Sequence, residues 1–431
     1  MKTILKRIIV DNQERSFNGI FERSYNIPLN TKKIVSLIGV RRSGKTFELY
    51  NLINKLRETV NSNRILFINF EDDRLYPFSL ELLNLLIESY YELYPQNRKN
   101  KIYIFLDEIQ NIDGWELFVR RIHDTLNAQI FITGSSSKLL SKEIATSLRG
   151  RTISYEIFPF SFKEFLNSKN ININLNSSNS VSYIKKHFDD YLINGGFAET
   201  FDEEPEVQKK ILKDYLDLIV YKDLVERYSI KNQSLVRHLI KYLFVNMGTL
   251  VSFTKLFNQY KSLGYKVSKD TLFDYMSYLE DSYTLFTTSI HRNSVKEENR
   301  HPKKIFAIDN GFKKLFDINY SEDYSKLYEN LVFLHLRRKT SEIYYAKQKQ
   351  EIDFYVKTDQ LYLINVSYDI SDPQTFERET SALLEGMNYY KVDKSILITA
   401  EKEDTYQTDN KTIHIIPLWK WLIMDNSFNK L

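Results

Sequence analysis

Residues 34–46 read IVSLIGVRRSGKT, and this stretch decides the fold of the first part of the 431-residue chain. A short β-branched apolar run over residues 34–38 predicts a buried strand, and apolar periodicity over residues 49–56 predicts a helix. The loop between them fits the pattern GxxxxGK[ST] with Gly39, Val40, Arg41, Arg42, Ser43, Gly44, Lys45 and Thr46. Strand, loop and helix in this order predict a phosphate-binding loop, or P-loop.

The residue types of this loop suit a nucleotide phosphate chain. Its glycines let the loop fold back, so that backbone N–H groups and the helix N-terminus face the phosphates. We expect Lys45 to reach the β- and γ-phosphate oxygens and Thr46 to offer its hydroxyl to Mg²⁺. The alternative is a chance glycine-rich turn, which is disfavoured because glycine makes up only 12 of 431 residues. The sequence therefore predicts ATP and Mg²⁺ as cofactors.

A second apolar run ends in two carboxylates. Residues 101–108 read KIYIFLDE, which predicts a buried strand that places Asp107 as a metal ligand, and Glu108 as the group that orients the attacking water. An Asp-Glu pair at a strand end is otherwise typical of a helix cap or a solvated turn. Residues 64–73 and 128–135 predict two further strands, so we expect an α/β parallel sheet with its ligand crevice at the strand carboxyl ends.

Two further groups are candidates for contact with the γ-phosphate. Thr133 or Ser135, at the end of the strand predicted over residues 128–135, would sense this phosphate, unless the segment is an ordinary turn. Arg151, and with a weaker claim Arg149, would serve as an arginine finger in cis or from a neighbouring subunit. Surface arginine is the alternative, and a finger supplied in trans would require an oligomer.

The order of motifs resembles a bacterial and archaeal family of AAA-type ATPases. Its members pair an N-terminal P-loop domain with a C-terminal domain of unknown function that is similar to restriction endonucleases. The resemblance implies nucleotide binding and hydrolysis, and covers essentially the whole chain. It rests on GVRRSGKT (39–46), NFED (69–72), LDEIQ (106–110), GWE (114–116), TGSS (133–136), LRGR (148–151), FPFSFKEF (158–165), YLINGGFAE (191–199) and DLVERYSI (223–230).

The chain beyond the P-loop domain divides by composition and pattern. An Asn- and Ser-rich stretch over residues 167–180 predicts a boundary. We therefore expect a P-loop ATPase domain over 1–165, a linker and helical lid over 166–230, a winged-helix-like module over 231–310 and an α/β restriction-endonuclease-like domain over 311–431. The winged-helix interpretation rests on three predicted helices followed by hairpin arms at 283–290 and 304–308. A helical subdomain used only for packing is the alternative.

Lysine and arginine gather in three places beyond the lid. Such clusters suit contacts with DNA phosphates, with a protein partner as the alternative, and for the last cluster a solvated basic face is equally compatible. No base readout is predicted, because surface lysines report charge and not sequence. The clusters are Lys255, Lys261, Lys266 and Lys269; then Arg292, Lys296, Arg300, Lys303 and Lys304; and then Arg337, Arg338, Lys339, Lys347 and Lys349.

The C-terminal pattern of helix, strands, helix and strand resembles a PD-(D/E)xK nuclease core. Such a core needs two carboxylates to hold Mg²⁺ and a lysine to polarise the reacting groups. A helix carries Glu329, and Asp353 is present. The expected Glu-x-Lys positions, however, read Asn365 and Ser367. We therefore predict that the fold is retained without nuclease activity.

Composition excludes several other functions. The chain has no cysteine, which excludes disulfides, thiolate metal sites and cysteine nucleophiles. No uninterrupted apolar stretch reaches about 18 residues, so we expect a cytoplasmic protein without membrane contact. We expect a Mg²⁺-dependent ATPase that couples turnover to conformational change on DNA or a partner protein. The alternatives are a slow nucleotide-controlled switch or scaffold and, disfavoured by Asn365 and Ser367, an ATP-dependent nuclease.

Overall fold

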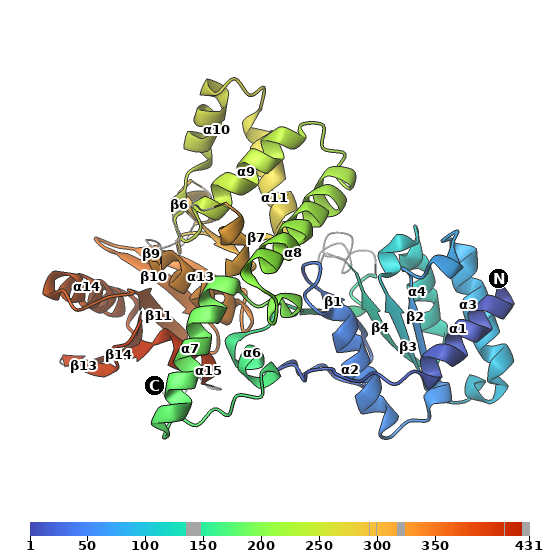
Figure 1. Cartoon of the computed structure of the whole chain (residues 1–431). Helices are drawn as coiled ribbons and strands as arrows, with labels where there is room; N and C mark the ends of the chain where they lie inside the picture. The colour runs from blue at the N-terminus through green and yellow to red at the C-terminus, as the bar shows by residue number, and fades with distance from the viewer. Residues whose placement is uncertain (135–147, 293, 299, 317–323, 409, 425–431) are drawn as a thin grey trace. The chain divides into compact units, whose positions relative to one another are not determined.

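The apolar runs of the first unit of the chain, Met1–Phe158, form one sheet in the computed structural model (Figure 1). The strand order is β2-β3-β4-β1-β5, and every neighbouring pair is parallel. This confirms the predicted α/β fold with a parallel sheet. The strands are β1 (Ile34–Ile38), β2 (Ile65–Asn69), β3 (Ile102–Asp107), β4 (Ala128–Thr133) and β5 (Thr152–Glu156).

Helices cover both faces of this sheet (Figure 1). The helices are α1 (Lys2–Glu14), α2 (Lys45–Arg57), α3 (Leu80–Leu93) and α4 (Trp115–Thr125). Crossovers between parallel strands are right-handed. Helix α2 connects β1 to β2, toward one edge of the sheet, whereas α3 and α4 connect strands in the opposite direction, from β2 to β3 and from β3 to β4. Helix α2 therefore lies on the opposite face of the sheet from α3 and α4. The apolar side of α2 packs there on Val35, Leu37, Phe105 and Phe131, which fixes the start of α2 directly behind the end of β1.

The second unit, Pro159–Leu431, begins with helices. They are α6 (Phe162–Ser168), α7 (Ser178–Asn194) and α8 (Pro205–Leu218), and α8 runs on into a π-helix over Ile219–Glu226. The helices expected between residues 166 and 230 are present. A π-helix widens the i→i+4 ladder to i→i+5, a detail that side-chain periodicity does not reveal.

Four helices and a small three-stranded sheet follow in the described residues. The elements are α9 (Gln233–Val245), β6 (Leu250–Val251), α10 (Phe253–Ser262), α11 (Lys269–Asp281), β7 (Leu285–Thr288), α12 (Val295–Glu298) and β8 (Lys303–Ala307). The strand order is β6-β8-β7, with both pairs antiparallel. The predicted helices and hairpin arms are confirmed. Strand β6 was not predicted, because its two residues carry no periodicity and are defined only by pairing with β8.

Three α-helices and a six-stranded sheet follow, up to the last described residues. The sheet order is β13-β14-β12-β11-β10-β9. Helix α14 packs on one face so closely that a Cβ on Gly386 would lie 2.2 Å from Ile352 Cδ1. The elements are α13 (Tyr324–Arg337), β9 (Ile343–Lys347), β10 (Glu351–Lys357), β11 (Leu361–Val366), α14 (Pro373–Tyr390), β12 (Lys394–Thr399), β13 (Asp404–Thr408), β14 (Lys411–Pro417) and α15 (Leu418–Ile423).

The two sheets of the second unit are joined edge to edge. Beyond β7, Ile290 forms a parallel bridge with Tyr345 of β9. His291 N–H donates to the Tyr345 carbonyl at 2.7 Å, and Tyr345 N–H donates to the Ser289 carbonyl at 3.1 Å. The hairpin therefore continues into the C-terminal sheet.

The structure describes residues 1–134, 148–292, 294–298, 300–316, 324–408 and 410–424. Within these ranges, no helix has both the length and the apolar character needed to cross a bilayer.

Candidate functional site

The loop between β1 and α2 has a backbone conformation that depends on its two glycines, Gly39 and Gly44. Gly39 has φ 148°, and a Cβ there would lie 2.2 Å from the Ile157 carbonyl oxygen. Gly44 has φ 94° and caps the start of α2. Lys45 lies inside the loop, where its Nζ donates to the carbonyls of Gly39 at 3.1 Å and Val40 at 3.0 Å. The loop thus curls around the ammonium group, in the form that a phosphate-binding loop requires.

A buried arginine outside the motif also supports the loop. The Arg23 guanidinium donates to the Ser43 carbonyl at 3.2 Å and to the Phe158 carbonyl at 2.8 Å. Only 6% of this side chain is exposed, and it lies over the ring of Tyr25. Sequence reasoning missed Arg23, because a single arginine in an irregular segment has no motif or periodicity to mark it.

Asp107, the last residue of β3, is the centre of the site. It is fully buried. Thr46 Oγ1 donates to Asp107 Oδ2 at 2.9 Å, and Thr133 Oγ1 donates to Oδ1 in a short hydrogen bond. Burial and the neighbouring charge of Glu108 raise the pKa of Asp107 to about 7. The carboxylate therefore lacks a full counter-charge from the protein, and a hydroxyl with a carboxylate is a donor set that Mg²⁺ prefers.

Glu108 is held in an unusual backbone conformation beside this carboxylate. Its φ and ψ are 54° and 41°, in the left-handed region that few residues other than glycine adopt. Its N–H donates to Thr133 Oγ1 at 3.0 Å, and Gln110 Nε2 donates to its Oε2. Strained residues of this kind gather at functional sites. The ends of β3 and β4 thus bring together Asp107, Glu108 and Thr133, as the strand-end argument predicts.

Arg151 lies at the other end of β1. The Arg151 carbonyl accepts a hydrogen bond from the N–H of Ile34, the first residue of β1. The phosphate-binding loop follows the last residue of β1, at the opposite end of the strand. The Arg151 guanidinium forms two hydrogen bonds with Asp124, at 2.9 and 3.0 Å. Arg149 is exposed nearby. Arg151 is thus not grouped with the other candidates in one chain, and its role as a finger remains a prediction that requires a second copy. Ser135 lies outside the described residues.

One residue of the predicted basic surface is buried. Lys304 is only 3% exposed, and its Nζ lies 2.7 Å from Asp353 Oδ1. The expectation that Lys304 adds to a nucleic-acid surface is therefore wrong. The cause is the position of β8, whose residues from Lys304 onward are buried.

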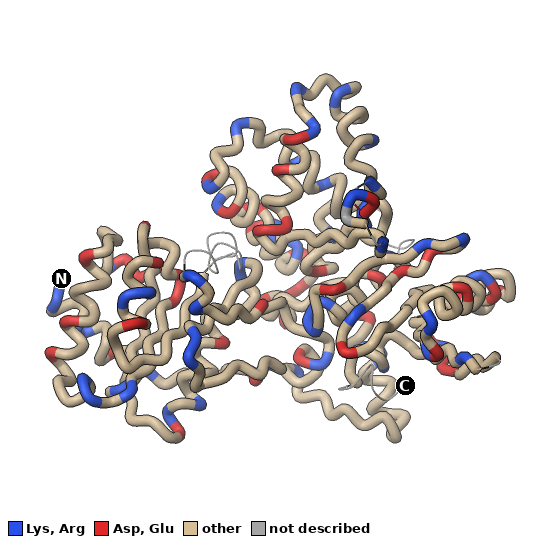
Figure 2. The backbone as a smooth tube through the Cα atoms, turned by 180° about the vertical axis from the view of Figure 1, so that it is seen from behind, with Lys and Arg blue, Asp and Glu red and all other residues tan. Residues whose placement is uncertain are grey.

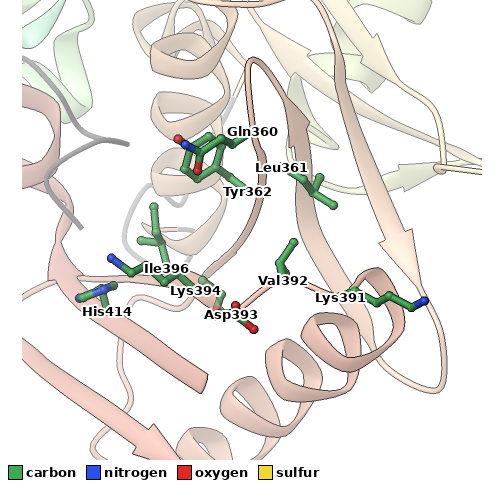
Figure 3. A pocket seen from close by; sticks show the side chains of 10 residues that line it. Gln360, Leu361, Tyr362, Lys391, Val392, Asp393, Lys394, Ile396 and His414 are labelled. Carbon is green, nitrogen blue, oxygen red and sulfur yellow. The ribbon is translucent and has the colours of Figure 1, made fainter. Parts of the chain in front are cut away.

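The second unit contains a hollow of about 520 Å³, and Figure 3 shows the side chains that line it. It is lined by Gln360, Leu361, Tyr362, Lys391, Val392, Asp393, Lys394, Ser395, Ile396 and His414. Burial and the charge of Lys394 lower the pKa of His414, so its ring is neutral near pH 7. We assign no chemistry to this hollow, because its charged side chains do not converge on a common point in Figure 3.

Comparison with known proteins places this geometry in context. Residues 31–166 match the AAA domain family, and residues 185–319 match a domain of unknown function, DUF8612. Among solved structures, the ORC1 protein of Aeropyrum pernix, in complex with DNA, covers 75% of this chain and 92% of its own at 14% identity, with a TM-score of 0.31. A likeness of that size supports no statement about function.

Two relatives resemble nearly the whole chain. The uncharacterized protein MJ1544 of Methanocaldococcus jannaschii is 37% identical, over 97% of this chain and 95% of its own. An uncharacterized protein of Haemophilus influenzae is 31% identical, over 91% of this chain and 94% of its own. With the AAA match at residues 31–166, the chain belongs to the family of AAA-domain proteins that these two relatives represent.

Proposed function

We propose that the chain is a Mg²⁺-dependent ATPase whose site is built from Lys45, Thr46, Asp107, Glu108 and Thr133. The observation that carries this proposal is the pair of threonine hydroxyls on Asp107, one from α2 and one from β4. They fix the carboxylate beside the loop that encloses Lys45. Thr46 and Asp107 would hold a Mg²⁺ ion, which would supply positive charge to neutralise the charge that develops on the phosphates.

Each side chain then has a defined task. Lys45 exchanges its carbonyl contacts for phosphate oxygens. Thr46 and Asp107 hold the metal. Glu108 orients the attacking water and accepts its proton, because its carboxylate is positioned by Gln110 and by the strained backbone. The other loop residues, 39–44, present backbone N–H groups to the phosphates.

Steady-state hydrolysis of ATP by the full chain with Mg²⁺ tests this proposal. We expect Glu108→Gln to abolish turnover and to keep nucleotide binding, and Lys45→Ala to weaken both. Glu81→Gln, at an exposed position of α3, is the matched control and should behave as wild type. Wild-type turnover equal to that of Glu108→Gln would contradict the proposal. Tight binding without turnover in wild type would identify a nucleotide-controlled switch instead.

For the second unit, we propose a linker and helical lid over 166–230, a winged-helix-like module over 231–310 and a restriction-endonuclease-like domain over 311–431. The order helix, strand, helix, helix, strand, strand, with the one-turn helix α12 between the last two strands, and the sheet order β6-β8-β7 support the winged-helix assignment. We expect no DNA cleavage, because Asn365 supplies an amide beside Asp353. Cutting of supercoiled plasmid with Mg²⁺ or Mn²⁺, abolished by Asp353→Ala, would contradict this expectation.

DNA is the partner that the charges of the winged-helix module favour. Lys255, Lys261, Lys266 and Lys269 are all exposed on α10, the following turn and the start of α11, and Figure 2 shows blue segments along this part of the chain. Helix α11 itself carries four acidic residues and one lysine. Because such a helix is repelled by the major groove, we propose contact with phosphates and no sequence readout.

Binding of fluorescent duplex DNA at several salt concentrations tests this proposal. Replacing the four lysines by alanine should weaken binding and reduce the slope of log K against log salt by about 0.9 for each phosphate that the variant no longer neutralises. Alanine at the exposed Lys209, Lys210 and Lys213 is the control. Equal binding by both variants would refute the interface. DNA-independent ATPase activity would then favour a protein partner.

A further inference from the structure

A buried lysine of the hairpin lies among three carboxylates. Lys304, on β8, has its Nζ 2.7 Å from Asp353 Oδ1, 3.0 Å from Glu351 Oε1 and 3.3 Å from Glu329 Oε2. Glu329 comes from α13, and the other two acids come from β10. The lysine belongs to the three-stranded sheet, whereas its partners belong to the helix and sheet that follow.

The chemistry of this cluster matches an ammonium ion. An ammonium group has three donors and no acceptor, and three carboxylate oxygens surround it. Burial alone would lower the pKa of Lys304, but Asp353, Glu329 and Glu351 raise it well above its usual value. Lys304 therefore stays charged, and its ammonium group lies within 3.3 Å of an oxygen of each of the three acids.

The remaining hydrogen bonds of Asp353 leave little room for another cation. Its Oδ2 accepts from Val366 N–H at 2.9 Å, and its N–H donates to Asn365 Oδ1 at 3.2 Å. The other end of the Asn365 amide donates to Glu379 at 2.8 Å. A PD-(D/E)xK nuclease would need a carboxylate at the position of Asn365. The residues present do not fit a metal ion, because the amide adds no charge and an ammonium group already lies between the acids.

We propose that Lys304 is an internal cation that takes the place of a divalent metal, so that this carboxylate cluster excludes metal in the native protein. The same residue ties the hairpin to α13 and β10. A neighbouring contact strengthens this tie, because Asn330 of α13 bonds both the N–H and the carbonyl of Ala307, at 2.8 and 3.1 Å. The hairpin and the C-terminal sheet then move as one body. None of this depends on the proposed ATPase activity.

Binding of Mn²⁺ to the full, nucleotide-free chain, followed by the loss of its free-ion electron paramagnetic resonance signal, tests the proposal. Lys304→Ala removes the ammonium and opens space, and should bind about one more Mn²⁺ per chain than wild type. The double variant Lys304→Ala/Asp353→Asn should lose this extra ion. Lys303→Ala, the preceding lysine of β8, is the matched control and should bind as wild type. Wild type itself supplies the background from the P-loop.

The result that overturns the proposal is a Lys304→Ala variant that folds and gains no Mn²⁺. A second comparison decides the question even where Lys304→Ala does not fold. Glu351→Gln in the otherwise wild-type chain changes the most exposed acid of the cluster. Its Mn²⁺ binding should equal that of wild type, because no metal binds there. A lower value would mean that the native cluster already holds a metal, and would refute the exclusion.

Discussion

Replacing Thr133 by valine tests the hydrogen bonds at the centre of the proposed site. Valine keeps the shape of threonine and removes only the hydroxyl. In the native chain that hydroxyl donates to Asp107 and accepts from the N–H of Glu108 at 3.0 Å. The variant therefore changes the support of both acids without opening a cavity.

The size of the effect follows from these two contacts. A hydrogen bond to a charged group contributes about 1.5–3 kcal/mol, and a buried N–H left without a partner costs about 1–3 kcal/mol. Glu108 is already in a left-handed conformation, so its position depends on such support. If about 3–4 kcal/mol of this support is absent in the transition state, hydrolysis slows by about 10²–10³-fold.

The pH dependence should change as well. The Thr133 hydroxyl lowers the pKa of Asp107, which burial raises to about 7. Without the hydroxyl this pKa rises further, so at neutral pH more of the carboxyl holds a proton that competes with Mg²⁺. The Mg²⁺ concentration for half-maximal rate should therefore be higher in the variant, with a larger difference near pH 6.5 than near pH 8.

Single-turnover hydrolysis with the protein in excess over ATP, together with binding of a fluorescent nucleotide, measures both effects. We expect the variant to bind nucleotide nearly as well as wild type, because Thr133 is not part of the loop. Thr133→Ser keeps the hydroxyl and is the matched control, with a rate close to wild type. A Thr133→Val variant that hydrolyses ATP at the wild-type rate would refute the proposed support of Asp107 and Glu108.

Three further predictions concern other parts of the chain. Arg23→Met should weaken nucleotide binding in a titration, because the Ser43 carbonyl of the loop loses its donor; unchanged affinity would exclude support of the loop by Arg23. Gly39→Ala should abolish binding in the same titration, since the added Cβ meets the Ile157 carbonyl at 2.2 Å. Burial raises the pKa of Asp309 from 3.8 to about 7, so between these values the folded chain keeps a proton that the unfolded chain releases. The free energy of unfolding therefore falls as pH rises from about 4 to about 7, by at most about 1.4 kcal/mol per pH unit. Asp309→Asn should reduce this fall, measured as melting temperature from pH 5 to 7, and an unchanged slope would contradict the assignment.

The core of the first unit was predictable because its signals are local. A phosphate-binding loop requires two glycines, a lysine and a hydroxyl residue within eight positions. The acids at the end of β3 and the threonine at the end of β4 follow from a geometric rule, since parallel strands place their carboxyl ends at one edge. Local pattern and sheet geometry together were enough to group Lys45, Thr46, Asp107, Glu108 and Thr133.

Residues that act through distant contacts were not predictable in this way. Arg23 supports the loop from an irregular segment, and one of its acceptors, the Phe158 carbonyl, is 135 positions away. Gln110 lies within a quoted motif, but only the structure shows that its amide holds Glu108. Strand β6 exists through its pairing with β8, more than 50 positions later. Such contacts depend on which segments meet in three dimensions.

Lys304 was assigned to the surface because it lies in sequence among Arg292, Lys296, Arg300 and Lys303, and lysine is rarely buried without partners. Its partners are 25 to 49 positions away in sequence, so no local sequence pattern could predict them. The buried ammonium nevertheless strengthens an inference drawn from different residues. Asn365 and Ser367 argue against metal-dependent cleavage because a carboxylate and a lysine are absent there, whereas Lys304 argues against it because a cation is already present. Restoring the residues at 365 and 367 alone would leave the ammonium between the carboxylates, and removing the ammonium alone would leave the amide. The two arguments are therefore independent, and metal-dependent cleavage would require both to fail.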